Sequence, residues 1–553
     1  MSDQISTLQK VRAGYSPKLP AALAGGVNKV VAQQGAPTGA AADEALVKSQ
    51  FPHCFGQPVV TFAPGTADGV GQRLNVGVVL SGGQAPGGHN VISGLFDGLK
   101  GVHPDCRLLG FKGGPQGLVD DDYIDLTADV IDAYRNTGGF DIIGSGRTKL
   151  SSEKQFEQVK ETALRNDLAA IVVIGGDDSN TNACLMAEWF QKQGSKVQVI
   201  GVPKTIDGDL RNEQIETSFG FDTAAKVYSE LIGNICRDAN SAKKYWHFIK
   251  LMGRSASHIA LEAALQTHPN LCLISEEVET QQMTLKQIVD QVCDVVVRRA
   301  RAGKNFGVAL IPEGLIEFIP EMKALIGELN EILAKNKDYF ATLSTNDDRF
   351  EFINRELSQP SSHAFSSLPT AIQEQLMLER DSHGNVPVSM IKTEELIIDL
   401  VKSRLNRLKA SGEYSGKFSP LSHFFGYEGR CAAPTNFDAD YCYSLGYNAV
   451  ALIAQGLTGY MSCVSGLTKP AAEWQAGGVP LTMMMNIERR HGEDVPVIRK
   501  ALVELNGKPY SEFVAHRHAW ADGEQYLYPG PIQYFGPSEV CDQPTMTLIL
   551  ERG

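Results

Sequence analysis

Short apolar runs of strand length recur along the chain and alternate with segments whose apolar residues have helical spacing. The runs occupy residues 75–80, 169–174, 197–202, 245–251 and 306–311. After the first run, Val91, Ile92, Leu95 and Leu99 recur with the period of an amphipathic helix. Continuous apolar runs of this length are typical of strands buried on both faces of a parallel sheet. The pattern therefore predicts an α/β fold with an open, mostly parallel sheet flanked by helices.

The pattern changes at both ends of this region. The start of the chain is rich in Ala, Gly and Pro and predicts an irregular extension, whereas Leu325, Leu329 and Leu333 and then residues 391–408 predict amphipathic helices. The predicted segments are an N-terminal extension (1–70), two α/β domains (71–215 and 216–318), a helical insertion (319–419), and a return to the α/β domains with a C-terminal segment (420–553).

Composition excludes several classes of function. The net charge of −13 argues against general nucleic-acid binding, which favours a basic face. No stretch approaches 18 apolar residues and the first 30 residues lack the apolar core of a signal peptide, so neither a membrane span nor secretion is expected. The ten cysteines include no Cys-x-x-Cys pair and are expected to be free thiols in the cytoplasm. No His/Cys spacing suggests zinc.

A glycine-rich loop, Ser81-Gly-Gly-Gln-Ala-Pro-Gly-Gly88, follows the first run directly. Glycines at a strand end let backbone N–H groups approach a phosphate, and the following helix adds its positive N-terminal end. The loop has neither the Lys-Ser/Thr ending of a P-loop nor the spacing of a dinucleotide fingerprint. By itself it is equally consistent with a structural turn.

The loop after the second run, Gly175-Gly-Asp-Asp-Ser-Asn180, adds two carboxylates. Asp177 stands at a predicted strand end, where it is suited to hold Mg²⁺ beside a polyphosphate. A helix start capped by Asp178 or Ser179 is the structural alternative. Two adjacent acids are unexpected in a plain phosphate site, because each repels additional phosphate groups.

The loop after the third run, Lys204-Thr-Ile-Asp-Gly-Asp209, contains the groups that phosphoryl transfer to a hydroxyl requires. Lys204 can neutralise charge on phosphate oxygens, and Thr205 can hydrogen-bond a phosphate. Asp207 can accept the hydroxyl proton, and Asp209 can orient the hydroxyl or bind a metal. A polar turn built on Asp-Gly is the structural alternative.

Other polar residues near strand ends suit the recognition of a sugar phosphate. Arg254 and Arg430 offer guanidinium groups for phosphate in Met252-Gly-Arg254 and Tyr427-Glu-Gly-Arg430. Glu313 can accept hydrogen bonds from sugar hydroxyls, with a helix N-terminal charge as the alternative. Further candidates are Arg147 and the cluster Lys243, Lys244 and His247, which otherwise forms a solvated strand edge, whereas His89 and His258 are expected to be structural.

Together these segments resemble the phosphofructokinase family, over roughly residues 70–480 and in the family's order. The matching segments are 81–88, 175–179, 203–209, 252–254, 312–314 and 427–430. ATP-using members carry Gly-Gly-Asp-Gly-Ser in the second loop and a small residue before Thr in the third, where this chain has Asp178 and Lys204. Both departures are similar to the pyrophosphate-using branch, and the length and the insertion are similar to its long-chain form. A carboxylate at 178 would repel the α-phosphate of a nucleotide, and Lys204 would compensate the compact charge of pyrophosphate.

The resemblance also implies roles for individual residues. It implies two phosphofructokinase-type domains, of which 71–215 binds pyrophosphate and Mg²⁺ and 216–318 binds fructose 6-phosphate. Asp207 would be the general base that deprotonates the 1-hydroxyl, with Thr205 and Asp209 in support, and Asp177 would bind Mg²⁺. Implied pyrophosphate contacts are Gly82, Arg147 and Lys204; implied fructose 6-phosphate contacts are Thr205, Ile206, Asp207, Lys244, Tyr245, Met252, Gly253, Arg254, Glu313, Tyr427, Glu428, Gly429 and Arg430.

Lys244 and Tyr245 resemble a segment that reaches into a neighbouring subunit's site, which implies a homodimer or a larger homo-oligomer. Three alternatives to a pyrophosphate-dependent enzyme remain open. An ATP-dependent phosphofructokinase is disfavoured by Asp178 and Lys204. NAD and diacylglycerol kinases share Gly-Gly-Asp loops but are not expected to carry the 203–209 motif. A non-catalytic regulatory subunit is disfavoured because Asp177, Lys204 and Asp207 are all present.

Overall fold

The chain forms two compact units in the computed structural model, which describes residues 7–66, 71–378, 380, 387–490, 493–530 and 542–553. Unit 1 contains the described residues of Met1–Val227, Tyr427–Ala501 and Ile532–Gly553, and unit 2 contains those of Tyr228–Gly426 and Leu502–Pro531. The predicted α/β fold is confirmed in both units. The described residues after 420 are shared between the two units.

Unit 1 is built on a ten-stranded sheet in the order β1-β2-β14-β13-β8-β7-β3-β4-β5, with β6 paired to β3. The pairs β13/β8, β8/β7, β7/β3, β3/β4 and β3/β6 are parallel, and antiparallel strands complete both edges. The strands are β1 (Val30–Pro37), β2 (Pro58–Pro64), β3 (Asn75–Ser81), β4 (Arg107–Phe111), β5 (Tyr123–Asp125), β6 (Ser145–Gly146), β7 (Leu168–Gly175), β8 (Gln198–Pro203), β13 (Tyr460–Ser465) and β14 (Gln475–Pro480).

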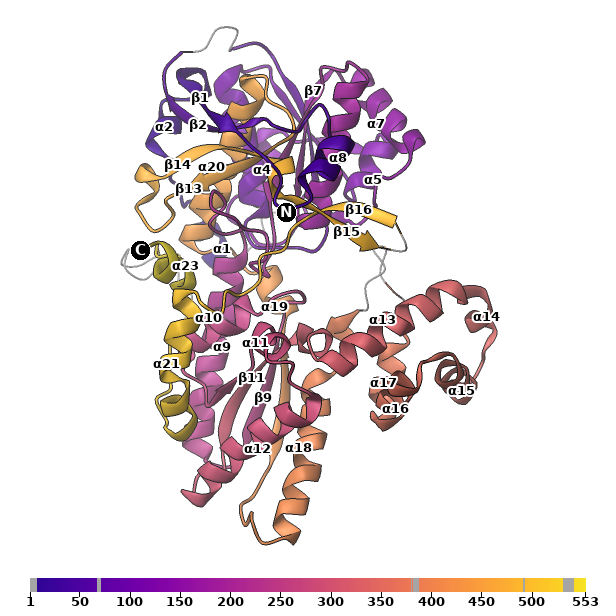
Figure 1. The fold of residues 1–553 in the computed structure, drawn as a ribbon. Helices are drawn as coiled ribbons and strands as arrows, with labels where there is room; N and C mark the ends of the chain where they lie inside the picture. The colour runs from indigo at the N-terminus through magenta and orange to yellow at the C-terminus, as the bar shows by residue number, and fades with distance from the viewer. Residues whose placement is uncertain (1–6, 67–70, 379, 381–386, 491–492, 531–541) are drawn as a thin grey trace. The chain divides into compact units, whose positions relative to one another are not determined.

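Helices cover both faces of this sheet (Figure 1). Helices α7 and α8 pack on the face that carries Val79, Ile171 and Val173, and α4 and α20 pack together on the other face. The helices are α1 (Thr7–Ala13), α2 (Ala21–Ala24), α3 (Glu44–Gln50), α4 (Gly88–Val102), α5 (Pro115–Asp120), α6 (Ala128–Tyr134), α7 (Glu153–Arg165), α8 (Asp177–Lys192), α19 (Tyr427–Arg430), α20 (Asn436–Ala454) and α23 (Met546–Arg552). Short 3₁₀ turns (Val27–Lys29, Ala471–Glu473 and Leu481–Met484) and a separate hairpin of β15 (Met485–Arg490) and β16 (Glu493–Ile498) complete the unit.

The N-terminal segment is part of unit 1 and is more regular than its composition predicts. Strands β1 and β2 form an antiparallel hairpin, and β2 pairs with β14 at Gly477 and Gly478. A Cβ atom at Gly477 would overlap the backbone of Val60, so the close approach of the two strands requires glycine there. The Ala, Gly and Pro content that indicated an irregular extension therefore belongs to an edge of the sheet, where such residues are tolerated.

Unit 2 contains a smaller sheet of four parallel strands in the order β10-β11-β9-β12. Its strands are β9 (Trp246–Leu251), β10 (Leu271–Cys272), β11 (Gly307–Pro312) and β12 (Pro420–Phe425). Its helices are α9 (Phe221–Ala242, which begins in unit 1), α10 (His258–Thr267), α11 (Ser275–Thr280), α12 (Leu285–Arg301), α13 (Pro320–Lys335), α14 (Lys337–Thr342), α15 (Asn346–Glu356), α16 (Gln359–Ser367), α17 (Thr370–Leu376), α18 (Thr393–Ala410) and α21 (Lys508–Asp522), with 3₁₀ turns η3 (Glu313–Glu317) and η4 (Val388–Met390).

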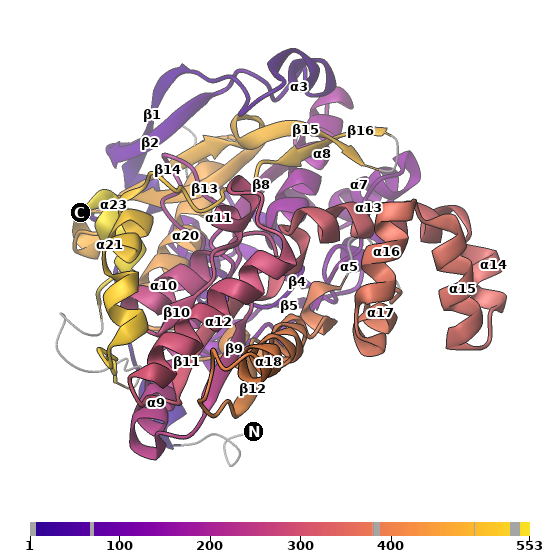
Figure 2. The same ribbon diagram turned by 60° about the horizontal axis from the view of Figure 1, so that its bottom comes forward.

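The segment interpreted as an insertion consists of helices α13 to α18 and shares a hydrophobic core with the sheet of unit 2. Trp246 and Phe248 of β9 pack in one cluster with Leu325 and Leu329 of α13 and with Ile397 of α18. Figure 2 shows α12 and α18 side by side along this sheet, while α14 to α17 extend away from it. The insertion is therefore anchored on the sheet through α13, η4 and α18.

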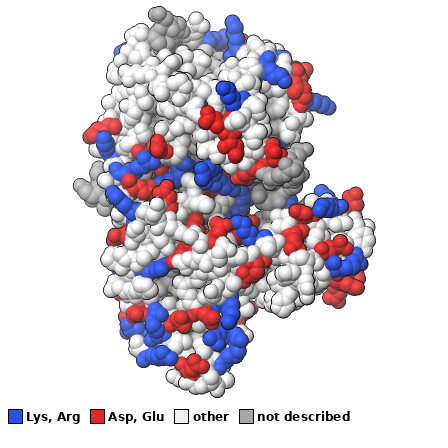
Figure 3. Space-filling view, viewed as in Figure 1, with Lys and Arg blue, Asp and Glu red and all other residues white. Residues whose placement is uncertain are grey.

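The surface carries both signs of charge. On the face drawn in Figure 3, Lys and Arg side chains are interspersed with Asp and Glu over both units, so the net charge of −13 is not gathered into one acidic patch there. Within the described part of the chain, no helix has the length and apolar character needed to span a membrane.

Candidate active site

The three polar loops of unit 1 meet because their strands are neighbours. In the parallel register, Leu80 of β3 pairs with Ile174 of β7, and Gly175 pairs with Pro203 of β8. The loops 81–88, 175–180 and 203–209 therefore leave the sheet at the same edge, where ligands bind in open α/β sheets. The predictions from sequence about these three strands are confirmed to within one residue at each start and end.

Lys204 lies at the centre of this edge. It is only 6% exposed, and its N–H donates to the carbonyl of Gly175 over 3.0 Å. Burial first, and then Arg430 and Arg147, lower the pKa of Lys204, whereas Asp207 and Asp177 raise it, and the net pKa is about 8. A buried ammonium group flanked by guanidinium groups is a strong anion site, because any bound anion relieves the repulsion among the cations.

Gly82 and Gly83 make room for these cations. Gly82 has φ +85°, and a Cβ atom built on it would lie 3.3 Å from Lys204 Nζ. Its N–H already donates to Gly146 over 2.9 Å, so its contribution to an anion site is the open space beside Lys204. A Cβ atom at Gly83 would overlap the guanidinium group of Arg430, and Arg147 Nη2 would lie 3.7 Å from it.

The other end of the same loop is structural. A Cβ atom at Gly87 would overlap Cys442 of α20, and one at Gly88 would overlap the ring of Phe140. These two glycines therefore allow α4 to pack closely. His89, the next residue, is buried; its Nδ1 lies 2.7 Å from Thr137 Oγ1, and burial lowers its pKa to about 4, in keeping with its predicted structural role.

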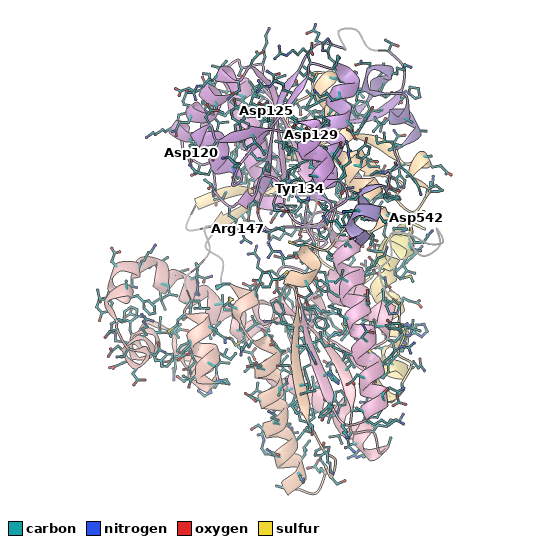
Figure 4. All side chains as sticks on the ribbon, turned by 180° about the vertical axis from the view of Figure 1, so that it is seen from behind. Asp120, Asp125, Asp129, Tyr134, Arg147 and Asp542 are labelled. Carbon is teal, nitrogen blue, oxygen red and sulfur yellow. The ribbon has the colours of Figure 1, made fainter. Side chains whose placement is uncertain are left out.

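Arg147 follows β6, which pairs with the end of β3 at Ser81. Its side chain is exposed and makes no hydrogen bond or ion pair with the residues that the structure describes. Figure 4 shows it at the margin of unit 1. Arg147 is therefore a cation that is available to an anionic ligand.

The acidic loop opens helix α8. Gly176 is the N-cap of this helix and provides no side-chain cap, so neither Asp178 nor Ser179 has the capping role considered above. Asp177 and Asp178 lie in the first turn, where the helix dipole favours carboxylates. Ser179 Oγ instead donates to Ser81 Oγ over 2.8 Å and joins the first two loops.

The third loop turns sharply at Gly208, which has φ +75°. The N–H of Asp207 donates to Thr205 Oγ1 over 3.1 Å, and Ser218 Oγ donates to the carbonyl of Thr205 over 3.0 Å. Asp207 and Thr205 are half-buried, whereas Ile206 and Asp209 are buried. The turn thus holds the half-buried Asp207 near Lys204, whose pKa it raises.

The exit of the β15–β16 hairpin clamps the second and third loops and was not predicted from the sequence. The N–H of Ile498 donates to Thr181 Oγ1 over 3.1 Å, and the N–H of Ala501 donates to the carbonyl of Asp209 over 2.7 Å. Lys500 Nζ lies 3.6 Å from Asp177 Oδ2. Lys500 thus adds a further cation to the edge, but no motif in the sequence around it distinguishes it from a surface lysine.

The segment Tyr427–Arg430 forms the short helix α19 and belongs to unit 1. Arg430 Nη2 donates to Gln84 Oε1 over 2.7 Å, and its guanidinium group lies 5.3 Å from the centre of the Tyr427 ring. Glu428 and Tyr427 are exposed, and Gly429 is buried. The sequence motif is therefore placed at the first loop, and the contact with Gln84 explains why Arg430 affects the pKa of Lys204.

The remaining candidates lie in unit 2, at the carboxyl ends of β9 and β11. Gly253 has φ +131°, and its N–H donates to Glu313 Oε1 over 3.2 Å. A Cβ atom at Gly314 would overlap the backbone of Arg254, so the two loops pack backbone to backbone. Met252 and Glu313 are buried and Arg254 is half-buried. The structure thus brings Met252, Gly253, Arg254 and Glu313 together.

Lys244 and Tyr245 are exposed at the start of β9 and are separated from this group by the length of the strand. The neighbouring His247 is buried, and its ring stacks on that of His423, with His247 Nδ1 2.9 Å from His423 Nε2. Burial, and then His423, lower the pKa of His247 to about 4. His247 is therefore a neutral structural residue and not the phosphate ligand considered from the sequence.

The donor set of unit 1 fits Mg²⁺. Within the described residues, no three His, Cys, Asp or Glu side chains form a preformed metal cage. Mg²⁺ is commonly held by one or two carboxylates while substrate phosphates and water supply its other ligands. Asp177 at the helix start, with Asp207 on the neighbouring loop, is a donor set of this kind.

The chain is similar to known proteins in both sequence and fold. Residues 75–351 match the family model described as phosphofructokinase. Proteins named pyrophosphate–fructose 6-phosphate 1-phosphotransferase from Porphyromonas gingivalis and Treponema pallidum are each 57% identical to the chain; both matches cover 99% of this chain, with 99% and 97% of those proteins. The crystal structure of a pyrophosphate-dependent phosphofructokinase from Nitrosospira multiformis has a similar fold, with a TM-score of 0.54 at 18% identity over 83% of this chain and 95% of that one.

Proposed function

The chain belongs to the phosphofructokinase family. We propose that the edge of the unit 1 sheet where the loops 81–88, 175–180 and 203–209 meet around Lys204 is the donor site of a pyrophosphate-dependent 6-phosphofructokinase. The enzyme transfers a phosphoryl group from pyrophosphate to the 1-hydroxyl of fructose 6-phosphate and releases fructose 1,6-bisphosphate and phosphate. The names of the full-length relatives support this reaction. The observation that carries it is the buried Lys204 among Arg147, Arg430, Asp177 and Asp207.

This arrangement favours a compact, highly charged donor. Pyrophosphate concentrates its negative charge on two phosphorus centres, and a buried ammonium group next to two guanidinium groups stabilises such an anion in a medium of low dielectric constant. Asp178, in the first turn of α8, places a carboxylate where a longer polyphosphate chain would meet repulsion. ATP-using members of the family that the chain resembles carry glycine at the position of Asp178 and a small residue at the position of Lys204.

Asp177 is proposed to hold Mg²⁺, which when bound neutralises charge on the donor and on the leaving phosphate. Lys500, 3.6 Å from Asp177 in the structure, is placed to orient that carboxylate or to contact the donor. Gly82 and Gly83 keep the space beside Lys204 and Arg430 open for phosphate oxygens.

Asp207 is proposed to be the general base. It accepts the proton of the 1-hydroxyl as the hydroxyl oxygen forms a bond to the transferred phosphorus atom. The bond from that phosphorus atom to the bridging oxygen of pyrophosphate breaks, and phosphate leaves. The hydrogen bond from the Asp207 N–H to Thr205 fixes the loop that carries the base. Asp209 supports the same turn through its carbonyl contact with Ala501.

Met252, Gly253, Arg254 and Glu313 of unit 2 are proposed to bind fructose 6-phosphate, and the family resemblance implies the same role for Tyr427, Glu428, Gly429 and Arg430. Arg254 supplies a guanidinium group for the 6-phosphate, and Glu313 accepts hydrogen bonds from sugar hydroxyls. Gly253, held by Glu313, fixes the turn that carries Arg254.

We further propose that the enzyme is a homo-oligomer in the cytoplasm. Leu421 is a large apolar side chain, 40% exposed, on β12, which has no neighbour on one side of the unit 2 sheet among the described residues; Tyr245, 38% exposed, precedes the adjacent strand β9. Residues of this kind at a sheet edge favour association with a second copy, in agreement with the implied reach of Lys244 and Tyr245 into a neighbouring site.

The test is product formation by the purified single chain. Fructose 1,6-bisphosphate should form with pyrophosphate and Mg²⁺, and should not form at a comparable rate with ATP and Mg²⁺. Turnover with ATP alone would identify an ATP-dependent enzyme. Inactivity with both donors would support the regulatory-subunit alternative.

A further inference from the structure

A lysine is buried in the core of unit 2, on the strand that leads to the proposed sugar-phosphate residues. Lys250 is 2% exposed on β9, where it pairs in register with Ile311 of β11 and Phe424 of β12. An ammonium group in such a position is strongly destabilising unless its donors are satisfied. The proposed reaction assigns no role to Lys250.

The partners of Lys250 come from the helical insertion. Its Nζ donates to the carbonyls of Ser389 over 3.0 Å and Ile391 over 2.9 Å, and it lies 3.6 Å from Glu394 Oε2. It also lies 4.4 Å from the centre of the Phe424 ring. Lys250 thus makes two hydrogen bonds and one ion pair to one short segment, the end of η4 and the start of α18.

Lys250 in turn stabilises polar groups of the insertion that would otherwise lack a partner. The carbonyls at the end of a helical turn have no partner within the turn, and Lys250 supplies one. Glu394 is 5% exposed in the first turn of α18; burial raises its pKa, and Lys250 opposes that rise. Removing Lys250 would leave two carbonyls without this donor and a buried carboxylate without its ion-pair partner, so the junction between the insertion and β9 depends on Lys250.

The end of β9 is tied to the proposed sugar-phosphate residues by short links. Leu251 follows Lys250, and the N–H of Met252 donates to the carbonyl of Phe425 of β12 over 3.0 Å. The N–H of Gly253 donates to Glu313. A shift of the β9 end by even a fraction of an ångström therefore moves both Met252 and Arg254, and acceptor binding is sensitive to such shifts.

We propose that Lys250 is a positioning residue that locks the helical insertion to the carboxyl end of β9 and thereby sets the geometry of the fructose 6-phosphate subsite. This inference rests on the proposed function for its substrate, but not for the lock itself. The insertion then has a defined role, because η4 and α18 hold the acceptor strand in place.

The test uses three variants: Lys250→Met, Glu394→Gln and the double variant that combines these two changes. The control is Lys402→Met, which removes an exposed lysine of α18. In Lys250→Met the KM for fructose 6-phosphate should rise about tenfold, while the KM for pyrophosphate changes less than about twofold. Glu394→Gln should show the same pattern at about threefold, and the double variant should be no worse than Lys250→Met. Lys402→Met should match the wild type.

A merely structural role predicts a different pattern. It would reduce kcat in proportion to the loss of folded protein and leave both KM values unchanged. If Lys250→Met does not fold, Glu394→Gln carries the comparison. An unchanged fructose 6-phosphate KM in folded Lys250→Met and Glu394→Gln, or an equal rise in both KM values, overturns the proposal.

A second measurement needs no activity. Amide hydrogen exchange across residues 246–254 should be at least about tenfold faster in Lys250→Met, or in Glu394→Gln, than in the wild type and in Lys402→Met. Unchanged exchange overturns the lock. A wild-type chain that is inactive with pyrophosphate refutes the proposed function, and the exchange result then decides the inference by itself.

Discussion

The guanidinium group of Arg430 occupies the space that a Cβ atom at Gly83 would need. Residues 347 positions apart in the sequence are therefore in direct contact at the donor edge of unit 1, and Gln84 holds the guanidinium group there through a hydrogen bond of 2.7 Å. The φ angle of Gly83 is not in the left-handed region, so an alanine can adopt its backbone conformation and would act only by displacing Arg430.

Gly83→Ala is therefore expected to reduce kcat/KM by about 10- to 100-fold without loss of stability, because a small displacement of a phosphate-binding group has effects of this size. Steady-state kinetics together with thermal unfolding check this. Gly327→Ala is the matched control, since nothing lies within 4 Å of its Cβ position. An active Gly83→Ala variant would mean that Arg430 can bind from a different position.

Lys204 predicts a pH dependence of donor binding. Its pKa in the free enzyme is lowered to about 8, so the ammonium form is lost as the pH rises through 8. The kcat/KM for pyrophosphate should fall above about pH 8, whereas kcat should hold to a higher pH because bound pyrophosphate raises the pKa of Lys204. A profile of kcat/KM that stays flat to about pH 9.5 would contradict this assignment.

We also expect the buried charge of Lys204 to lower the free energy of unfolding. Its pKa is lower in the folded chain than in the unfolded chain, so the charged form disfavours folding below about pH 8, and stability should increase as the pH rises from about 8 towards 10.5. Lys204→Met should therefore raise the free energy of unfolding at pH 7, by on the order of 2 kcal/mol, while it abolishes activity. Urea denaturation at pH 7 measures this, and a destabilised variant would contradict it.

If Asp207 is the general base, its substitution should affect kcat and not substrate binding. Asp207→Asn should lower kcat by about 10²- to 10⁴-fold, the usual contribution of a general base, and should change the KM of either substrate by only a few fold. Asp105→Asn, at an exposed carboxylate of unit 1, is the control and should have wild-type kinetics. A large rise in KM with little change in kcat would assign Asp207 to binding.

Lys500 predicts an effect on the donor alone. Lys500→Met removes the cation 3.6 Å from Asp177 and should raise the KM for pyrophosphate about five- to tenfold, with little change in the KM for fructose 6-phosphate. Lys469→Met, at an exposed lysine of the same unit, should leave both values unchanged. If Lys500→Met has wild-type kinetics, the hairpin exit has only a structural role.

The sequence predicted the parts of this site that are local in the chain. Strands β3, β7, β8, β9 and β11 are mainly apolar runs, and the polar residues that follow each run are at strand ends in the structure. Contacts between distant segments could not be predicted in this way. Lys500, Gln84 and the buried Lys250 are single residues whose surroundings come from other elements, so no local pattern distinguishes them.

The prediction of an irregular N-terminal extension was wrong. The segment 1–70 contains β1 and β2 at the antiparallel edge of the unit 1 sheet, and their glycines and prolines concealed the strand pattern. Residues 427–501 return to unit 1 because their strands complete its sheet, whereas residues 502–531 belong to unit 2. Strand order is set by pairing across the sheet, which the chain order does not reveal.

The choice of phosphoryl donor is decided by the ratio of kcat/KM for pyrophosphate to kcat/KM for ATP, measured in the wild type and in Asp178→Gly/Lys204→Gly. The wild type should use pyrophosphate at least about 10³-fold more efficiently than ATP. The ratio should fall by at least about 10³-fold in the double variant, because the repulsive carboxylate and the compensating ammonium group are both removed. A wild type that uses ATP as well as pyrophosphate, or a double variant with an unchanged ratio, would contradict the roles proposed for Asp178 and Lys204.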